Sequence, residues 1–243
     1  MCYNEKRLIF SFGGFYMRKI TSAVLALTVA ATGVLSTGCG GVDSNFSSDY
    51  VAGILDASYK GEFNNYIKMT DATEEDAQEI YDGTVDYFAS ALAYYCEVYT
   101  DDISEELYAE YTALAADLLK EAKYTIASAE SGKESCYVKV SIKPLNLLEQ
   151  IEDDITECVD VYNEKLEEIG AEALDSMSDE EYLQLEEEYA RSVLDAIKSN
   201  AENLEYKDNV DFTMEIIIDE EGCYGPANED DWNTIDDYIM GLS

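Results

Sequence analysis

Runs of neighbouring carboxylates are the residues of this sequence that could do chemistry. Two carboxyl groups held several ångströms apart in a cleft, one of them with a raised pKa, can hydrolyse a glycosidic bond. Both candidate runs fall on the polar side of predicted helices, where a solvated face is the ordinary explanation. A carboxylate-based enzyme acting on cell-wall carbohydrate is therefore the alternative function, not the leading one. Its candidate residues are Glu152, Asp153 and Asp154, and Glu186, Glu187 and Glu188.

Other catalytic and metal chemistry finds little support in the sequence. There is no histidine, which excludes Ser-His-Asp and Cys-His nucleophiles and His-ligated zinc. Three acidic clusters could offer oxygen ligands to Ca²⁺, but none has the alternating spacing of an EF-hand. We therefore expect weak divalent cation binding, but no cofactor, no dedicated metal site and no catalytic residue. The clusters are Asp101-Asp102, Asp219-Glu220-Glu221 and Glu229-Asp230-Asp231.

A different kind of chemistry is predicted at Cys39. After the basic pair Arg18-Lys19, an apolar stretch runs from Ile20 to Leu35, and Ser36-Thr37-Gly38 precede the cysteine. A basic start, an apolar segment and small residues before a cleavage point are typical of a secretory signal. The cysteine makes it similar to a bacterial lipoprotein signal, in which the thiol is linked to a diacylglycerol and the chain is cut just before it. Ser36 stands where such signals usually have leucine.

These features divide the chain into four parts. Residues 1–16 precede a complete signal and are interpreted as a mis-called extension, and residues 17–38 as the signal peptide. Residues 39–48 are predicted to be a flexible tether with a reach of roughly 30 Å, and residues 49–243 a single α+β domain. Attachment at Cys39 would place this domain on the extracytoplasmic face of the bacterial membrane.

Charge excludes one class of partner. The chain has 53 acidic and 15 basic side chains, a net charge of −38. Such a charge repels phosphate backbones, so we expect no nucleic-acid binding. A hydrophobic content of 47% is too high for a disordered acidic segment and indicates a folded core.

Four cysteines remain in the predicted domain. In an exported protein they permit three disulfide pairings, and the sequence does not choose among them. The interpretation we favour is that they are small buried hydrophobic residues. No Cys-x-x-Cys spacing suggests zinc. The four are Cys96, Cys136, Cys158 and Cys223.

Hydrophobic periodicity predicts the elements that must position these residues. A period of 3.6 predicts helices and a period of two predicts strands. Thr73 and Ser178, each followed by acids, are expected to cap long helices. We predict an α+β fold in which long amphipathic helices pack on one face of a three- to four-stranded antiparallel sheet. The predicted helices cover about 49–59, 62–69, 74–99, 104–122, 148–169, 179–204 and 230–240, and the strands 124–130, 136–143, 210–218 and 223–225.

Tyrosine is unusually frequent, with 20 residues. Most fall on the apolar faces of predicted helices and are expected in the core. Three fall off those faces, and exposed tyrosines could stack on sugars or bind peptides. The expected core set is Tyr81, Tyr95, Tyr99, Tyr111, Tyr162, Tyr182 and Tyr189, and the three others are Tyr87, Tyr94 and Tyr108.

Three segments resemble an uncharacterised lipoprotein family of Gram-positive Firmicutes that carries an α+β domain of unknown function. They are Leu55-Asp56-Ala57-Ser58-Tyr59-Lys60-Gly61-Glu62-Phe63 followed by Tyr66, Val138-Lys139-Val140-Ser141-Ile142-Lys143-Pro144, and the strand and turn from Ile216 to Gly222. This family has no assigned activity, so the resemblance implies no catalytic residue. The sequence therefore predicts a lipid-anchored, non-enzymatic domain that binds an envelope ligand or a protein.

Overall fold

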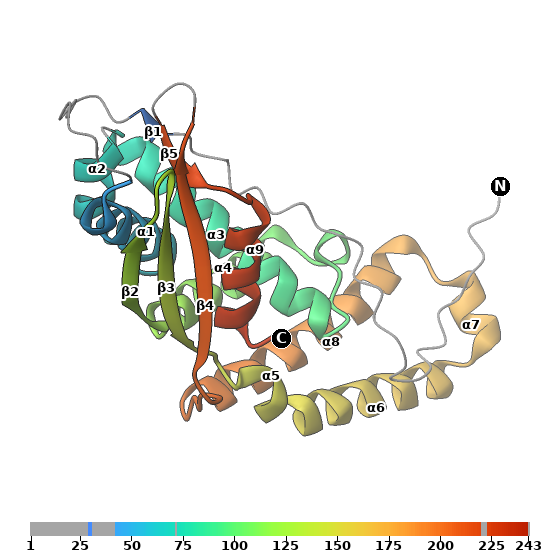
Figure 1. The fold of residues 1–243 in the computed structure, drawn as a ribbon. Coiled ribbons are helices and arrows are strands. Elements are labelled where there is room, and N and C mark those ends of the chain that lie inside the picture. Colours follow the sequence, from blue (N-terminus) through green and yellow to red (C-terminus); the bar gives the residue numbers. More distant parts are fainter. Residues whose placement is uncertain (1–28, 31–41, 71, 220–222, 243) are drawn as a thin grey trace.

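The computed structural model describes residues 29–30, 42–70, 72–219 and 223–242 (Figure 1). The predicted extension 1–16, the lipid-attachment residue Cys39 and all but two residues of the predicted signal peptide lie outside the described residues. Those two residues form β1 (Val29–Ala30). The fold class is α+β, as the sequence predicts.

The described strands form one antiparallel sheet. Its strand order is β1-β5-β4-β3-β2. The two predicted hairpins are confirmed, and they join because β3 pairs with β4, which places Val138 opposite Met214. The strands other than β1 are β2 (Lys123–Ser131), β3 (Ser135–Lys143), β4 (Val210–Ile218) and β5 (Cys223–Pro226).

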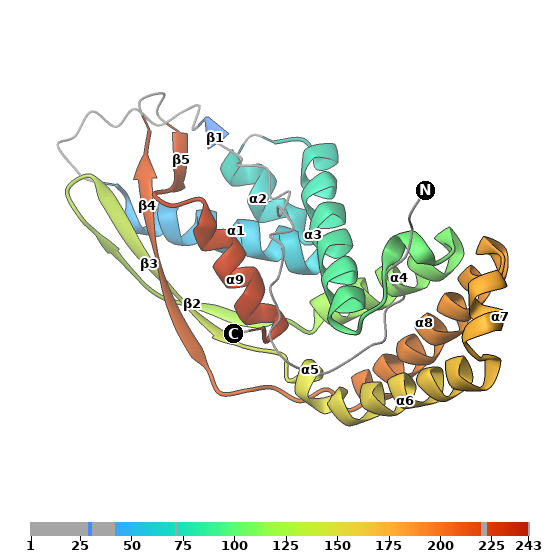
Figure 2. The same ribbon diagram turned by 90° about the vertical axis from the view of Figure 1, so that its right-hand side faces the viewer.

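Helices cover one face of this sheet, as Figure 2 shows. On β3 the alternating residues Val138, Val140 and Ile142 are fully buried, which confirms the predicted core face. The helix α1 (Ser44–Lys60) packs on β2 and β3, and α9 (Asp230–Met240) packs on β3 and β4. Beyond α1 lie α2 (Phe63–Thr70), α3 (Glu74–Tyr95) and α4 (Glu105–Lys120).

Local capping explains where the helices begin and end. Thr73 and Asp76 form a capping box at the start of α3, and Ser178 and Glu181 form another at α8 (Asp179–Ala201). Gly61 ends α1 in the left-handed conformation, with a φ of 64°. These three boundaries agree with the sequence-based prediction.

The predicted tether over residues 39–48 is wrong from Val42 onward. Val42 is only 3% exposed, and Asp43 caps α1 by accepting a hydrogen bond of 2.8 Å from the amide of Phe46. The ring of Phe46 lies 4.2 Å from that of Tyr224. The polar sequence around Ser44 is typical of a loop, but a capping aspartate and one aromatic contact are enough to make it the first turn of a helix.

The predicted helix over 148–169 is also more complex than expected. It is divided into α5 (Leu147–Gln150) and α6 (Glu152–Ile169), and a further short helix, α7 (Ala171–Ser176), precedes α8. Figures 1 and 2 both show α6, α7 and α8 extending away from the sheet. We call residues 152–201 the helical arm.

The register of β4 gives a direct test of the fold. Ile216 is fully buried on the core face, whereas Asp211 is exposed and pairs with Lys139 at 2.6 Å. We expect Ile216→Asp to lower the free energy of unfolding by at least about 4 kcal/mol, because it buries an unpaired charge. Asp211→Ala should cost less than about 1 kcal/mol, as an exposed ion pair contributes little. Equal shifts in thermal melts would contradict this register.

Candidate functional site

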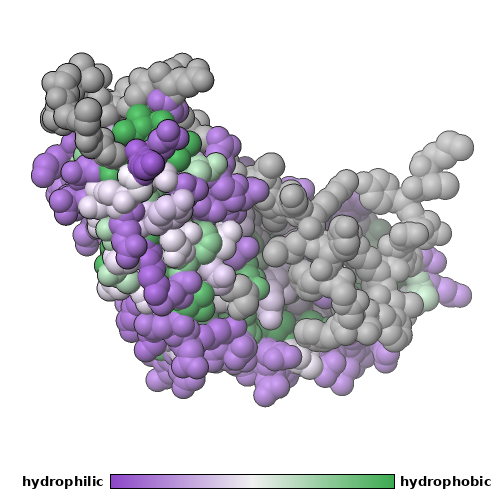
Figure 3. All heavy atoms as spheres, viewed as in Figure 1, coloured by the Kyte–Doolittle hydropathy of each residue, from purple (hydrophilic) through white to green (hydrophobic). Residues whose placement is uncertain are grey.

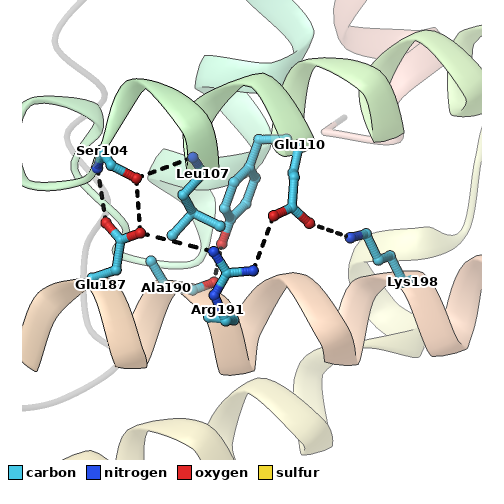
Figure 4. Close-up of polar contacts among 8 residues, drawn as sticks. Ser104, Leu107, Glu110, Glu187, Ala190, Arg191 and Lys198 are labelled. Carbon is cyan, nitrogen blue, oxygen red and sulfur yellow. Dashed lines mark hydrogen bonds and ion pairs between the residues drawn. The ribbon is translucent and has the colours of Figure 1, made fainter.

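The acidic run Glu186, Glu187 and Glu188 does not form a catalytic pair. Glu186 accepts a hydrogen bond of 2.6 Å from the hydroxyl of Tyr162 on α6. Glu187 accepts hydrogen bonds of 2.8 Å from both the amide and the hydroxyl of Ser104 (Figure 4). Glu188 pairs with Lys165. Successive residues of a helix point about 100° apart, so the three carboxylates meet three different neighbours and do not converge.

Charged contacts continue along the seam between α4 and α8 (Figure 4). Glu110 accepts hydrogen bonds of 2.9 Å from Arg191 and 2.9 Å from Lys198, and these cations hold the pKa of its carboxyl below the usual value. On the same seam, the hydroxyl of Tyr111 on α4 donates a hydrogen bond of 2.6 Å to the carbonyl of Ala190 on α8. These groups therefore hold the helical arm to the body, rather than surround a substrate.

The other acidic run, Glu152, Asp153 and Asp154, is exposed in the first turn of α6. Negative charge is favourable there because of the helix dipole. Asp154 accepts a hydrogen bond of 2.6 Å from Asn200 on α8. The run therefore lies on a solvated helix face, as expected from its sequence.

None of the three acidic clusters is assembled into a metal site among the described residues, and no other group of three acid or cysteine side chains is either. Asp219 instead closes the β4–β5 turn, since it accepts a hydrogen bond of 2.8 Å from the amide of Cys223. Glu220 and Glu221 lie outside the described residues. Weak divalent cation binding stays a prediction.

No disulfide joins any two of the domain's four cysteines in this structure. Cys96, Cys136 and Cys223 are buried and Cys158 is half-buried, which fits the interpretation of small apolar side chains. Burial raises the pKa of the Cys96 thiol. A buried thiol of raised pKa is a poor nucleophile.

The predicted exposed tyrosines are packed instead. Tyr108 donates to the carboxylate of Asp86 at 2.6 Å, and burial raises the pKa of Tyr87 to about 12. The ring of Tyr94 meets that of Tyr99 at 6.0 Å. Conversely Tyr182, expected in the core, is 46% exposed. It lies in the first turn of α8, on the helical arm.

Sequence reasoning missed a buried carboxyl, that of Asp236 on α9. It is 6% exposed and accepts a hydrogen bond of 2.5 Å from the hydroxyl of Tyr59. Tyr87 and Asp237 also lie near it. Burial raises the pKa of Asp236 from 3.8 to about 7, against the lowering effect of the Tyr59 hydrogen bond. An acid within the buried stripe of Ile235, Ile239 and Met240 was the available sequence signal.

A hollow of about 510 Å³ opens at the surface where α1 meets α2. Its rim carries carboxylates and amides, and its apolar residues are Phe63 and Ile67. One of the carboxylates, Asp56, is already engaged, because it accepts a hydrogen bond of 2.7 Å from Tyr124 and pairs with Lys60. The first of the three segments that resemble the lipoprotein family, residues 55–63, thus contributes Asp56, Gly61, Glu62 and Phe63 to this hollow. The rim residues are Asp56, Glu62, Asn64, Asn65 and Glu74.

The exposed large apolar side chains of the described residues lie on two parts of the molecule. Val161 (60% exposed), Tyr182 (46%) and Leu183 (44%) lie on the helical arm. Tyr137 (46%) and Ile218 (41%) lie at the opposite end of the molecule, on β3 and β4. The arm is also strongly acidic, with 17 acidic and 3 basic residues between positions 152 and 201.

Comparison with known proteins gives little guidance to function. No protein-family model matches the chain, and no curated protein matches its sequence. Among solved structures, the chain is similar to a candidate lipoprotein (ycdA) from Bacillus subtilis subsp. subtilis str. 168, with a TM-score of 0.49 and 13% identity. The match covers 80% of this chain but only 56% of that protein. Within the described ranges, no helix is both long enough and apolar enough to cross a bilayer.

The buried carboxyl of Asp236 predicts a pH-dependent stability. Below about pH 4 it is protonated in both states, and between about pH 4 and pH 7 only the unfolded chain ionises, so stability falls as pH rises. Above about pH 7 the loss is complete. Asp236→Asn keeps an acceptor for Tyr59 but cannot ionise. We therefore expect it to raise the free energy of unfolding at pH 8 by up to about 4 kcal/mol, which corresponds to the rise in the pKa of Asp236 from 3.8 to about 7.

Denaturant unfolding between pH 4 and pH 8 measures this effect. Asp230→Asn is the control, since Asp230 is exposed on the same helix. The control should keep the wild-type slope of stability against pH, and Asp236→Asn should flatten it. An unchanged slope in Asp236→Asn would show that this carboxyl does not govern the pH response.

Proposed function

We propose that the protein is an extracytoplasmic lipoprotein, attached to the membrane through Cys39, which binds a partner protein and has no catalytic role. The membrane attachment is supported by the sequence from Arg18 to Cys39. The binding role is supported by one structural observation, the helical arm that extends from the body and exposes apolar side chains among many acids.

The arm has the composition of a binding surface. Val161, Tyr182 and Leu183 are large apolar residues that remain exposed, and a tyrosine is among the residues that contribute most to interfaces. The arm that carries them has 17 acidic and 3 basic residues, so a partner that offers both basic and apolar residues would be complementary. We infer a basic protein of the cell envelope as the partner.

The body supports the arm firmly enough for this role. Tyr189 on α8 donates a hydrogen bond of 2.8 Å to the carbonyl of Cys96, and this bond and the Glu110 contacts to Arg191 and Lys198 attach the arm to the body. Within the arm, the rings of Tyr162 and Tyr189 lie 5.0 Å apart and join α6 to α8. A rigid surface loses little conformational entropy when it binds.

The alternative, an enzyme acting on cell-wall carbohydrate, has weaker support. Such an enzyme needs two carboxyls at a defined separation in a cleft. In the part of the chain that the structure describes, Glu186, Glu187 and Glu188 are committed to separate contacts, and Asp236 is buried and does not line the hollow.

Affinity capture from the solubilised cell envelope tests the binding role. Leu183→Glu adds a charge to the exposed apolar surface of the arm, and we expect it to reduce capture of the partner at least about tenfold. Gln184→Glu is the matched control, because it adds the same charge at the neighbouring exposed position and should retain the partner. Equal capture by both variants would contradict the assignment of the arm.

Fractionation of cells tests the anchor separately. Cys39→Ala removes the acylated thiol, so the protein should leave the membrane fraction or accumulate as an uncleaved precursor. A variant that fractionates and migrates like wild type would show that Cys39 is not lipidated.

A further inference from the structure

We propose that Cys96 and Cys158 are an oxidisable pair, which a disulfide oxidant joins as a covalent bond between the body and the helical arm. Cys96 directly follows α3, and Cys158 lies on α6. The inference goes beyond the proposed binding role, because the pairing does not depend on what the arm binds. Disulfides persist in oxidising compartments, so the proposed location of the protein is compatible with one.

Tyr189 of α8 contacts the surroundings of both cysteines. Its hydroxyl donates a hydrogen bond of 2.8 Å to the carbonyl of Cys96, and its ring lies 5.0 Å from that of Tyr162. Cys158 precedes Tyr162 by four residues on α6, and residues at this spacing share one face of a helix, with Cβ atoms about 5–6 Å apart. Cys96 and Cys158 therefore approach the same tyrosine, one from the body and one from the arm.

Electrostatic effects also place the two thiols near each other. Burial is the largest cause of the raised pKa of the Cys96 thiol, and the Cys158 thiol is the next. After burial, both cysteines contribute to the raised pKa values of Tyr111 and Tyr189. Because such interactions weaken with distance, these four side chains form one cluster where α8 meets the body.

The sheet keeps the other two cysteines apart. Cys136 on β3 is opposite Ile216 on β4, and Cys223 lies on β5, which pairs with the other edge of β4. The strands β3 and β5 are thus two strand spacings apart, about 10 Å. A disulfide requires Cα atoms within about 7 Å of each other. Cys136 and Cys223 therefore cannot join without movement of the backbone, and we expect one disulfide rather than two.

Exposure decides which thiol reacts first. Cys158 is half-buried, whereas Cys96 is fully buried. The Cys158 thiolate attacks one sulfur of a small disulfide, which releases one thiol and leaves a mixed disulfide on Cys158. The Cys96 thiolate then attacks the Cys158 sulfur and releases the second thiol. In total the two cysteines lose two protons and two electrons, and the oxidant gains them.

The disulfide would hold α6 directly to the body. The hydrogen bonds and ion pairs described above between the arm and the body come from α8, through residues such as Tyr189 and Arg191. Those described for α6 lead to α8 instead, as in the hydrogen bond from Tyr162 to Glu186. Oxidation would therefore add a covalent connection to the helix of the arm that these contacts reach only through α8.

The surface around Cys158 guides the choice of oxidant. Glu157 and Asp160 are exposed beside it on α6. Figure 3 shows mostly hydrophilic residues along the visible lower edge of the molecule, where Figure 1 places α6. An acidic surface attracts a small cationic disulfide and repels an anionic one, so cystamine is a suitable probe.

Oxidation of the full-length protein with cystamine tests the pair. Remaining thiols are blocked with N-ethylmaleimide after denaturation, and the protein is digested with trypsin without reduction. Cleavage after lysine places Cys96 in residues 69–120 and Cys158 in residues 140–165. We expect mass spectrometry to find these two peptides joined, in at least about tenfold higher yield than any other pair of cysteine peptides, since the fold holds the two thiols at a high effective concentration.

Two substitutions and a pH series sharpen the test. Cys158→Ser should abolish the joined product, whereas Cys136→Ser, the matched control on the sheet, should retain it. Closure of the mixed disulfide should become about tenfold faster from pH 7 to pH 8, because the Cys96 thiol, whose pKa is raised, must ionise. If Cys158 stays unmodified or carries only the mixed disulfide, the proposal is overturned, and similar yields of another pairing would overturn it too.

Discussion

The burial of α1 between the sheet and the other helices is the contact on which this fold depends. One side of α1 covers the core face of β2 and β3, and the other receives α2, α3 and α4. Such a position requires apolar residues around most of the helix, and Tyr50, Val51 and Leu55 are all at most 2% exposed. It also requires a small residue where α2 comes closest. Gly53 meets this need, since a Cβ there would lie 3.1 Å from the amide nitrogen of Tyr66.

Most of this architecture follows from local sequence patterns. Alternation along β3 and β4 gave the buried face, because a strand turns each successive side chain to the opposite side. The capping residues Thr73 and Ser178 gave the starts of α3 and α8, because their side chains satisfy free amides. The last helix begins and ends where predicted, at Asp230 and Met240. Patterns of this kind depend on neighbouring residues and are therefore visible without a structure.

The features that sequence did not predict depend on contacts between distant segments. Residues 44–48 join α1 because Phe46 meets Tyr224, which is far away in the chain. The carboxyl of Asp236 is buried because Tyr59 reaches it from α1. Likewise, Glu187 is a residue type that could serve as a catalytic acid, but its carboxylate accepts hydrogen bonds from Ser104 at the start of α4. Periodicity records which face a residue occupies, not which group it meets there.

Charge and the proposed lipid attachment have opposite effects on the approach of this molecule to a membrane. A chain with a net charge of −38 is repelled by anionic headgroups, so electrostatic attraction cannot hold it at a membrane. The acyl chains proposed at Cys39 could hold it there, because their insertion is driven by burial of CH₂ groups rather than by charge. Repulsion then favours an orientation in which the most acidic part is farthest from the bilayer. The helical arm, with 17 acidic and 3 basic residues between positions 152 and 201, is such a part, so the charge that opposes membrane binding would also keep the arm away from anionic headgroups.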